Sequence, residues 1–165
     1  MSITNIQITI GAFLILLWFW WYTRNTSIVR IKKGQIFNFK QSVELSGLAV
    51  ITLYQNSKKY HFLVDTGSNV SHIHSGCDIV IDSFEEDIDS VSGLSGDVEC
   101  RKCNITLYHG KDKLAFIFRH SDMSFVCQGI KETYGVSIDG IIGTDFMSKY
   151  NYCIDFKEYV VYERK

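Results

Sequence analysis

The first 23 residues contain no Asp, Glu, Lys or Arg, and this constrains the chain more than any other feature of its sequence. From Ile6 to Tyr22 the segment is apolar, with Gln7 and Thr9 as its polar interruptions. A helix over residues 3–22 is roughly 30 Å long, which matches the hydrocarbon core of a bilayer. The sequence therefore predicts a transmembrane anchor over residues 1–23 that contacts the lipid bilayer through residues 3–22.

The residues that flank this segment predict its orientation. All three tryptophans stand near its C-terminal end, where amphipathic rings favour the membrane interface. Four basic residues follow: Arg24, Arg30, Lys32 and Lys33. Because basic loops stay on the cytoplasmic side, we predict a single-pass membrane protein whose C-terminal domain is cytoplasmic.

A cleaved signal peptide and a buried core helix are the two other interpretations of the apolar segment. A cleaved signal peptide would have a basic start and small residues at its end, whereas this segment has neither. A buried core helix is seldom apolar on every face. An uncut anchor therefore remains the prediction.

The rest of the chain has room for one domain. Residues 24–41 are predicted to form a basic juxtamembrane connector and residues 42–165 a globular domain. A net charge of -1 gives no basic field for phosphates, so nucleic acid is not an expected partner.

Cysteine and histidine spacing gives no complete metal or redox site. Five cysteines, an odd number, suit a reducing compartment. Cys100 and Cys103 have the spacing of a redox or zinc half-site, but no second pair follows, and they are interpreted as parts of a strand. His72 and His74 likewise lack a third ligand. We predict no metal and no cofactor.

From Val43 onward the pattern is that of β-structure, and the predicted fold class is all-β. Short runs of β-branched and aromatic residues, separated by polar turns, predict the strands. These runs are Leu48–Tyr54, Tyr60–Val64, Val98–Tyr108, Leu114–Phe118, Ser124–Cys127 and Cys153–Tyr162. A single short helix is predicted over Thr144–Tyr150, with Thr144 or Asp145 as its cap.

A possible catalytic carboxylate stands where an apolar strand ends, in the run Phe-Leu-Val-Asp-Thr-Gly-Ser. Gly67 lets the backbone turn closely around Asp65. The hydroxyls of Thr66 and Ser68 can supply hydrogen bonds that fix the turn and support the carboxylate. The alternative is an ordinary loop after a strand, because Asp, Thr, Gly and Ser are all common turn residues.

A second motif gives the Asp65 run a more specific interpretation. Ile141-Ile142-Gly143 runs into the predicted helix, and Ile-Asp-Phe follows as a short strand. Together with Asp65-Thr-Gly-Ser, this resembles the retropepsin-like aspartic protease family from about Val43 to Tyr162. The resemblance implies a single-lobed acid-protease barrel with one short C-terminal helix. It also implies that Ile141, Ile142 and Gly143 thread behind the catalytic loop and buttress it.

The family also carries a glycine-containing hairpin, the flap, which closes over bound peptide. Here its position falls on Val91–Asp97, so Gly93, Leu94, Ser95 and Gly96 are the predicted substrate-binding residues. A plain surface loop is the alternative. The acidic run from Asp82 to Asp89 is predicted to be an inserted, solvated loop.

Peptide hydrolysis by carboxylates needs two of them at one water, and this chain has one such motif. A two-fold homodimer, with Asp65 from each subunit, is the economical solution, as in single-lobed members of the family. Retroviral relatives interleave their chain ends, but the anchor here leaves room for another arrangement. The predicted function is a membrane-anchored aspartic endopeptidase acting on a peptide or protein substrate.

Two rivals belong to other classes of protein. A membrane-tethered peptide-binding module would use the same fold without cutting. A thiol-redox protein would depend on Cys100 and Cys103 rather than on Asp65.

Overall fold

The computed structural model describes residues 33–93 and 96–164, and within them leaves out the side chains of Lys33, Gln35 and residues 87–98. The predicted anchor and the connector up to residue 32 lie outside the described residues. Among the helices that are described, none combines the length and apolarity needed to cross a membrane.

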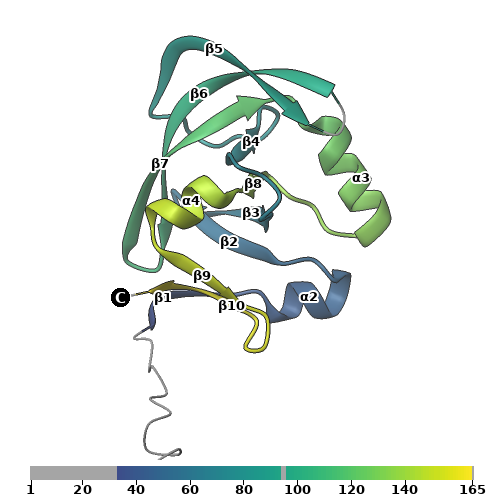
Figure 1. Ribbon diagram of the computed structural model, residues 1–165, viewed down its shortest axis with the longest axis vertical. Helices are drawn as coiled ribbons and strands as arrows, with labels where there is room; N and C mark the ends of the chain where they lie inside the picture. Colours follow the sequence, from purple (N-terminus) through teal and green to yellow (C-terminus); the bar gives the residue numbers. More distant parts are fainter. Residues whose placement is uncertain (1–32, 94–95, 165) are drawn as a thin grey trace, which may run out of the picture. The chain divides into compact units, whose positions relative to one another are not determined.

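The described chain is mostly β-structure, which confirms the predicted all-β class (Figure 1). In chain order the elements are β1 (Lys33–Asn38), α2 (Lys40–Ser46), β2 (Val50–Gln55), β3 (Lys58–Val64), β4 (His72–His74), β5 (Ser83–Gly93), β6 (Gly96–His109), β7 (Asp112–Ser121), α3 (Ser124–Tyr134), β8 (Gly140–Ile142), α4 (Thr144–Lys149), β9 (Tyr152–Asp155) and β10 (Val160–Arg164).

Most strands form one sheet in the order β2-β3-β8-β4-β7-β6-β5. A further pairing between β2 and β6, at Tyr54 and Tyr108, joins the ends of the first six and closes them into a barrel. β5 pairs with β6 outside this ring as a long antiparallel hairpin. Closure removes the free edges of the sheet, apart from that of β5.

Buried and exposed side chains alternate along the strands, and the buried ones fill the barrel interior. In β7, Leu114, Phe116 and Phe118 are buried while the residues between them are exposed, as expected for one inward face. Eight interior side chains are at most 1% exposed: Ile51, Leu53, Phe62, Ile73, Ile105, Leu107, Phe118 and Ile142.

A second sheet of three strands, in the order β1-β10-β9, is formed from the two ends of the described chain. Phe37 in β1 pairs with Val161 in β10, and both side chains belong to the same hydrophobic core as the barrel interior. The predicted connector is therefore wrong for residues 33–41, because β1 and the start of α2 are part of the folded domain.

The central strand β8 is inserted between β3 and β4, which are neighbours in sequence. It runs parallel to β3, with Leu63 opposite Ile141, and antiparallel to β4, with His72 opposite Ile141. Because strands flank both sides, the backbone of β8 has little space. A Cβ on Gly140 would lie 2.4 Å from the His72 carbonyl oxygen and 2.8 Å from the Phe62 ring.

Three sequence predictions of local structure were wrong. Cys153–Tyr162, predicted as one strand, is divided by a turn into β9 and β10. Ser124–Cys127, predicted as a strand, begins helix α3, where the Asp122 carboxylate accepts a hydrogen bond from the Ser124 amide at 2.9 Å. Gly135 ends this helix in the left-handed conformation. The acidic run, predicted as a solvated loop, largely belongs to strand β5. Helix α2 was not predicted at all.

Replacing Gly140 by Ala is expected to lower the free energy of unfolding by about 1–3 kcal/mol, because the added methyl group overlaps a backbone carbonyl that cannot move away. Urea titration of the domain from Ile28 onward measures the change. Gly129→Ala in α3 is the matched control, since an added Cβ there meets nothing within 4 Å. Equal losses in both variants would contradict the tight insertion of β8.

Candidate active site

Asp65 follows β3 directly, and its backbone is fixed to β8. The Asp65 amide donates a hydrogen bond of 3.0 Å to the Ile142 carbonyl oxygen, which extends the β3–β8 pairing by one residue. The chain then turns, with the Gly67 amide donating to Asp65 Oδ1 at 2.8 Å and the Ser68 amide to the Asp65 carbonyl at 3.2 Å. The carboxylate is thus held by a turn whose first residue is part of the sheet.

The far side of this loop rests on the start of α4. The Thr144 amide donates to the Ser68 carbonyl at 2.9 Å, and the Thr144 hydroxyl contacts the same oxygen at 3.3 Å. Gly143 is required between them, because a Cβ at this position would lie 2.6 Å from the Val70 carbonyl oxygen. Both predicted segments, residues 65–68 and residues 141–143, therefore meet in one place.

The two hydroxyl groups of the Asp65–Ser68 motif, on Thr66 and Ser68, make different contacts. Ser68 Oγ donates to the Val70 carbonyl at 2.7 Å, so it fixes the turn rather than the carboxylate. The Thr66 side chain is exposed, and within residues 33–93 and 96–164 no hydrogen bond to it is found.

A buried network behind the loop was missed by the sequence analysis. Ser71 is fully buried; its amide donates to Asp145 Oδ2 at 2.9 Å and its hydroxyl to Asp145 Oδ1 at 2.6 Å. The same hydroxyl accepts a hydrogen bond from the Gly143 amide at 2.9 Å. Asp145 was predicted only as a helix cap. It instead ties the chain that leaves the Asp65 turn to the segment that packs behind this turn.

The Asp65 carboxylate itself is accessible and uncommitted. It is half-buried, and in the described part of the chain it has one hydrogen-bond donor, the Gly67 amide, and no ion pair. Both carboxylate oxygens of Asp145 accept hydrogen bonds from Ser71, and Asp139, which accepts the His61 amide at 2.7 Å, precedes β8 at the end away from Asp65. Asp65 Oδ2 accepts no hydrogen bond from the described residues, so this oxygen is available to a ligand.

The predicted flap lies at the end of the β5–β6 hairpin. Its strands stay paired up to Gly93 opposite Gly96. Leu94 and Ser95 lie outside the described residues. The long hairpin has the topology required of a flap, but no hydrogen bond joins it to the Asp65 loop in the described part of the chain.

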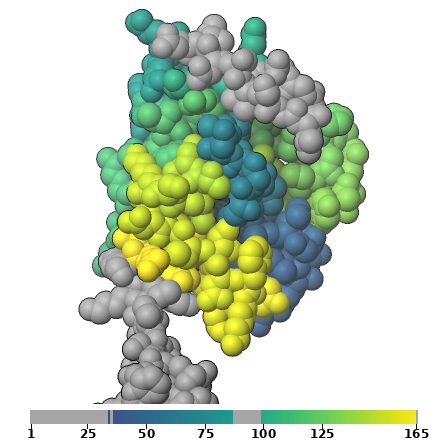
Figure 2. Space-filling view, in the orientation of Figure 1, coloured from purple at the N-terminus to yellow at the C-terminus, as the bar shows by residue number. Residues whose placement is uncertain are grey.

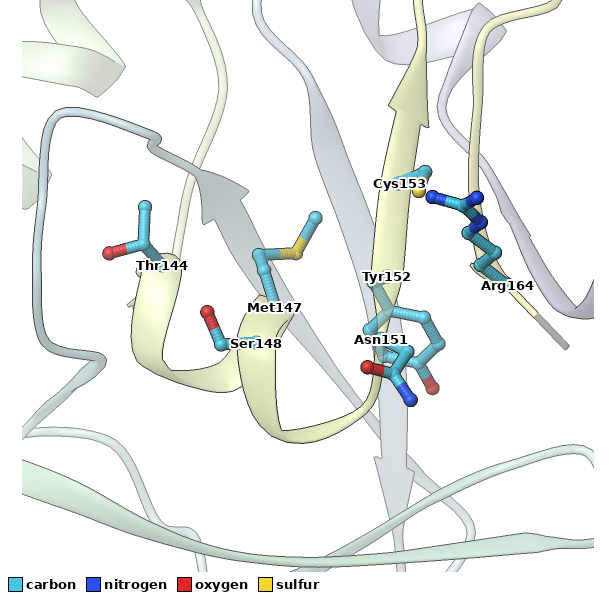
Figure 3. A pocket seen from close by; sticks show the side chains of 7 residues that line it. All are labelled: Thr144, Met147, Ser148, Asn151, Tyr152, Cys153 and Arg164. Atoms are coloured by element: carbon cyan, nitrogen blue, oxygen red, sulfur yellow. The ribbon is translucent and has the colours of Figure 1, made fainter.

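A hollow of about 610 Å³ does not include Asp65 in its lining (Figure 3 shows the lining residues). Its lining comes from α4, β9 and the end of β10: Thr144, Met147, Ser148, Asn151, Tyr152, Cys153 and Arg164. Thr144, which binds the Ser68 carbonyl, connects this hollow to the loop. Strand β9, which pairs with β10 in the described sheet, contributes Tyr152 and Cys153 to the lining.

The described residues offer no alternative chemistry at cysteine or histidine. No group of three or more His, Cys, Asp or Glu side chains in these ranges is placed to hold a metal ion. Cys100 and Cys103 are both buried, and burial raises the pKa of Cys103 to about 12. Three positions apart on one strand, they also point to opposite faces. This arrangement disfavours the thiolate that redox chemistry needs.

Comparison with known proteins does not assign the chain to a family. A scan against protein-family models and a search of curated proteins both find no match.

Ser71→Ala is expected to destabilise the domain by about 1–3 kcal/mol, because it leaves the buried Gly143 amide without an acceptor. Thermal or urea unfolding measures this loss. Ser75→Ala is the control, since Ser75 is exposed and its amide, not its hydroxyl, bonds to the Ser121 carbonyl. Equal stability of the two variants would show that the Ser71 network contributes little.

Proposed function

We propose that this protein is an aspartic endopeptidase of the retropepsin-like type, anchored in a membrane and active as a homodimer. The observation that carries the proposal is the insertion of β8 between β3 and β4, with Ile142 accepting the Asp65 amide. It brings the two motifs of the resemblance together, although about 75 residues separate them. The half-buried Asp65 carboxylate, which makes no ion pair with the described residues, supplies the chemical group.

The reaction requires a second carboxylate. Within the described residues, Asp139 precedes β8 at the end away from Asp65, and both carboxylate oxygens of Asp145 already accept hydrogen bonds from Ser71. A second copy of Asp65, related by a two-fold axis, supplies the missing group. Two adjacent carboxylates share one proton, so one acts as the general base toward water while the other protonates the peptide carbonyl oxygen.

The arrangement of the chain ends favours one surface for this dimer. β1 and β10 already pair within one chain, so they are not available to interleave as they do in retroviral relatives. The hollow lined by α4 and β9 adjoins the Asp65 loop through Thr144. We place the second subunit at this hollow, where it can bring its own Asp65 close.

Asp65→Asn is expected to reduce peptide cleavage by at least about 10²–10⁴-fold, because the amide cannot act as general base. The amide oxygen can still accept the Gly67 hydrogen bond, so the fold should persist. A mixed peptide library, assayed from acidic to neutral pH, measures cleavage. Asp112→Asn, at an exposed turn, is the control.

The outcome also separates the rival functions. Cleavage that survives in Asp65→Asn would refute the protease proposal. A wild-type dimer that binds peptides without cutting them would favour the tethered binding module.

The shared active site makes a second prediction. When wild-type and Asp65→Asn chains are coexpressed in equal amounts and assort freely, about one quarter of the dimers contain two wild-type subunits. Activity per total chain should fall to about that quarter of the wild-type value. A fall to only about half would mean that each chain works alone, and the dyad would be wrong.

A further inference from the structure

Helix α3 belongs to a segment, residues 122–139, that leaves the barrel after β7 and returns to it at β8. The helix lies at the side of the domain, in green at the right of both views (Figure 1 and Figure 2). None of its eleven residues is buried, and Phe125 is 82% exposed. Because a helix without buried side chains gains little from packing, the position of α3 depends on how the two ends of the segment are held.

One residue of β4, His74, holds both ends of this segment. Its amide donates a hydrogen bond of 2.9 Å to the Asp139 carbonyl, just before β8. Its imidazole Nδ1 lies 3.1 Å from the amide nitrogen of Met123, the buried residue that precedes α3. A backbone amide can only donate, so Nδ1 accepts this hydrogen bond and carries no proton. This contact, the His74 latch, therefore requires a neutral imidazole.

The imidazole of His74 has little freedom to turn away from the Met123 amide. Gly76 lies against the ring, and a Cβ at Gly76 would come within 2.6 Å of Nε2. The Cys77 amide donates to the His74 carbonyl at 3.1 Å and closes the turn that carries Gly76. The side chain is nevertheless 19% exposed, so protons from the solvent can reach it.

Asp122, at the junction of β7 and α3, is the carboxylate next to the latch. Its Oδ1 lies 3.9 Å from His74 Nδ1. The same oxygen accepts hydrogen bonds from the Ser124 hydroxyl at 2.6 Å and the Ser124 amide at 2.9 Å, at the first turn of α3. These hydrogen bonds lower the pKa of Asp122, so its carboxylate stays ionised at neutral and mildly acid pH.

The other titratable groups near His74 are neutral or are bound elsewhere. On β7, burial and the nearby Arg101 lower the pKa of His120, which favours its neutral form. In the turn after β4, burial raises the pKa of Cys77, so its thiol keeps its proton. The Asp139 carboxylate accepts a backbone amide of β3. Among the described residues, Asp122 is thus the acceptor for a protonated Nδ1.

We propose that protonation of His74 releases the first turn of α3, so that this segment responds to pH. A proton on Nδ1 turns the acceptor into a donor, and the Met123 amide then loses its partner. The charged ring moves to Asp122 and draws this carboxylate away from Ser124. Histidine side chains change charge between pH 5 and 8, so the latch forms at the upper end of this range and is lost as the pH falls. The inference does not depend on the proposed peptidase activity.

Release of α3 uncovers its half-buried side chains, Val126, Cys127 and Ile130. Strand β8 keeps its own pairing with β3 and β4, which does not involve the latch. The change is therefore confined to the excursion between β7 and β8, and the barrel stays folded.

Hydrogen–deuterium exchange of the full chain in detergent micelles, followed by mass spectrometry, tests the proposal. From about pH 7.5 to about pH 5, the range in which histidine titrates, the protection of residues 124–134 should fall at least about fivefold. The comparison is corrected for the pH dependence of chemical exchange. Protection of β6 and β7 in the same samples should be unchanged. Constant protection of α3 would overturn the proposal.

His74→Asn removes the titration. The Asn side-chain oxygen can take the place of Nδ1 and accept the Met123 amide, so protection of α3 should no longer depend on pH. His61→Asn is the matched control, because its Nδ1 lies 3.1 Å from Thr52 Oγ1 on β2 and not at α3. It should respond like the wild type. A loss in His74→Asn as large as that of the wild type would contradict the latch.

Asp122→Asn tests the receiving carboxylate and does not rely on the folding of the His74 variant, since the Asp122 side chain is 75% exposed. The amide oxygen can still accept the hydrogen bonds from Ser124. A neutral side chain attracts the charged imidazole less, so the release of α3 should shift to lower pH. A midpoint equal to that of the wild type would show that the protonated ring does not move to Asp122, and the proposal would be wrong.

Discussion

The hydrogen bond from the Asp65 amide to the Ile142 carbonyl is the contact on which the rest of the site depends. It exists because β8 enters the sheet between two strands that are adjacent in sequence. A buried strand of three residues must satisfy its peptide groups on both edges, and β3 and β4 do this. The strand pairing that satisfies the hydrogen bonds of the β8 backbone also fixes Asp65, the residue that follows β3. The position of the Asp65 carboxylate is therefore set by the sheet rather than by the loop.

The same insertion explains why small and polar residues lie in an otherwise apolar interior. Gly143 allows the loop backbone to approach within a distance that no Cβ would tolerate. The Ser71 hydroxyl is buried, yet it both donates and accepts a hydrogen bond, so its burial carries no unsatisfied group. Asp145 accepts hydrogen bonds from the Ser71 amide and hydroxyl and from the Phe146 amide. The site is thus pre-formed by a polar network, while Asp65 remains outside that network.

The sequence was sufficient where periodicity or a compact motif carried the information. Alternation predicted the strands that line the barrel, and the Ile-Ile-Gly motif correctly preceded a helix. It was insufficient where a few polar contacts decide the local structure. The run at Ser124 is apolar enough for a strand, but the hydrogen bonds from Ser124 to the Asp122 carboxylate and the left-handed Gly135 bound it as a helix. The Ser71–Asp145 pair is 74 residues apart, so only the three-dimensional fold brings it together.

The early start of β1 also bears on the proposed dimer. If residues 3–22 form the proposed anchor, ten residues separate it from β1, and the start of each domain would lie within about 36 Å of the bilayer. Two domains anchored in this way would lie on the same side of the membrane. A two-fold axis along the membrane normal is compatible with that constraint, whereas an axis in the membrane plane would place one domain on the wrong side. Anchoring in one membrane would also raise the effective concentration of one Asp65 with respect to the other. This favours the dimer, whose proposed active site needs one Asp65 from each chain.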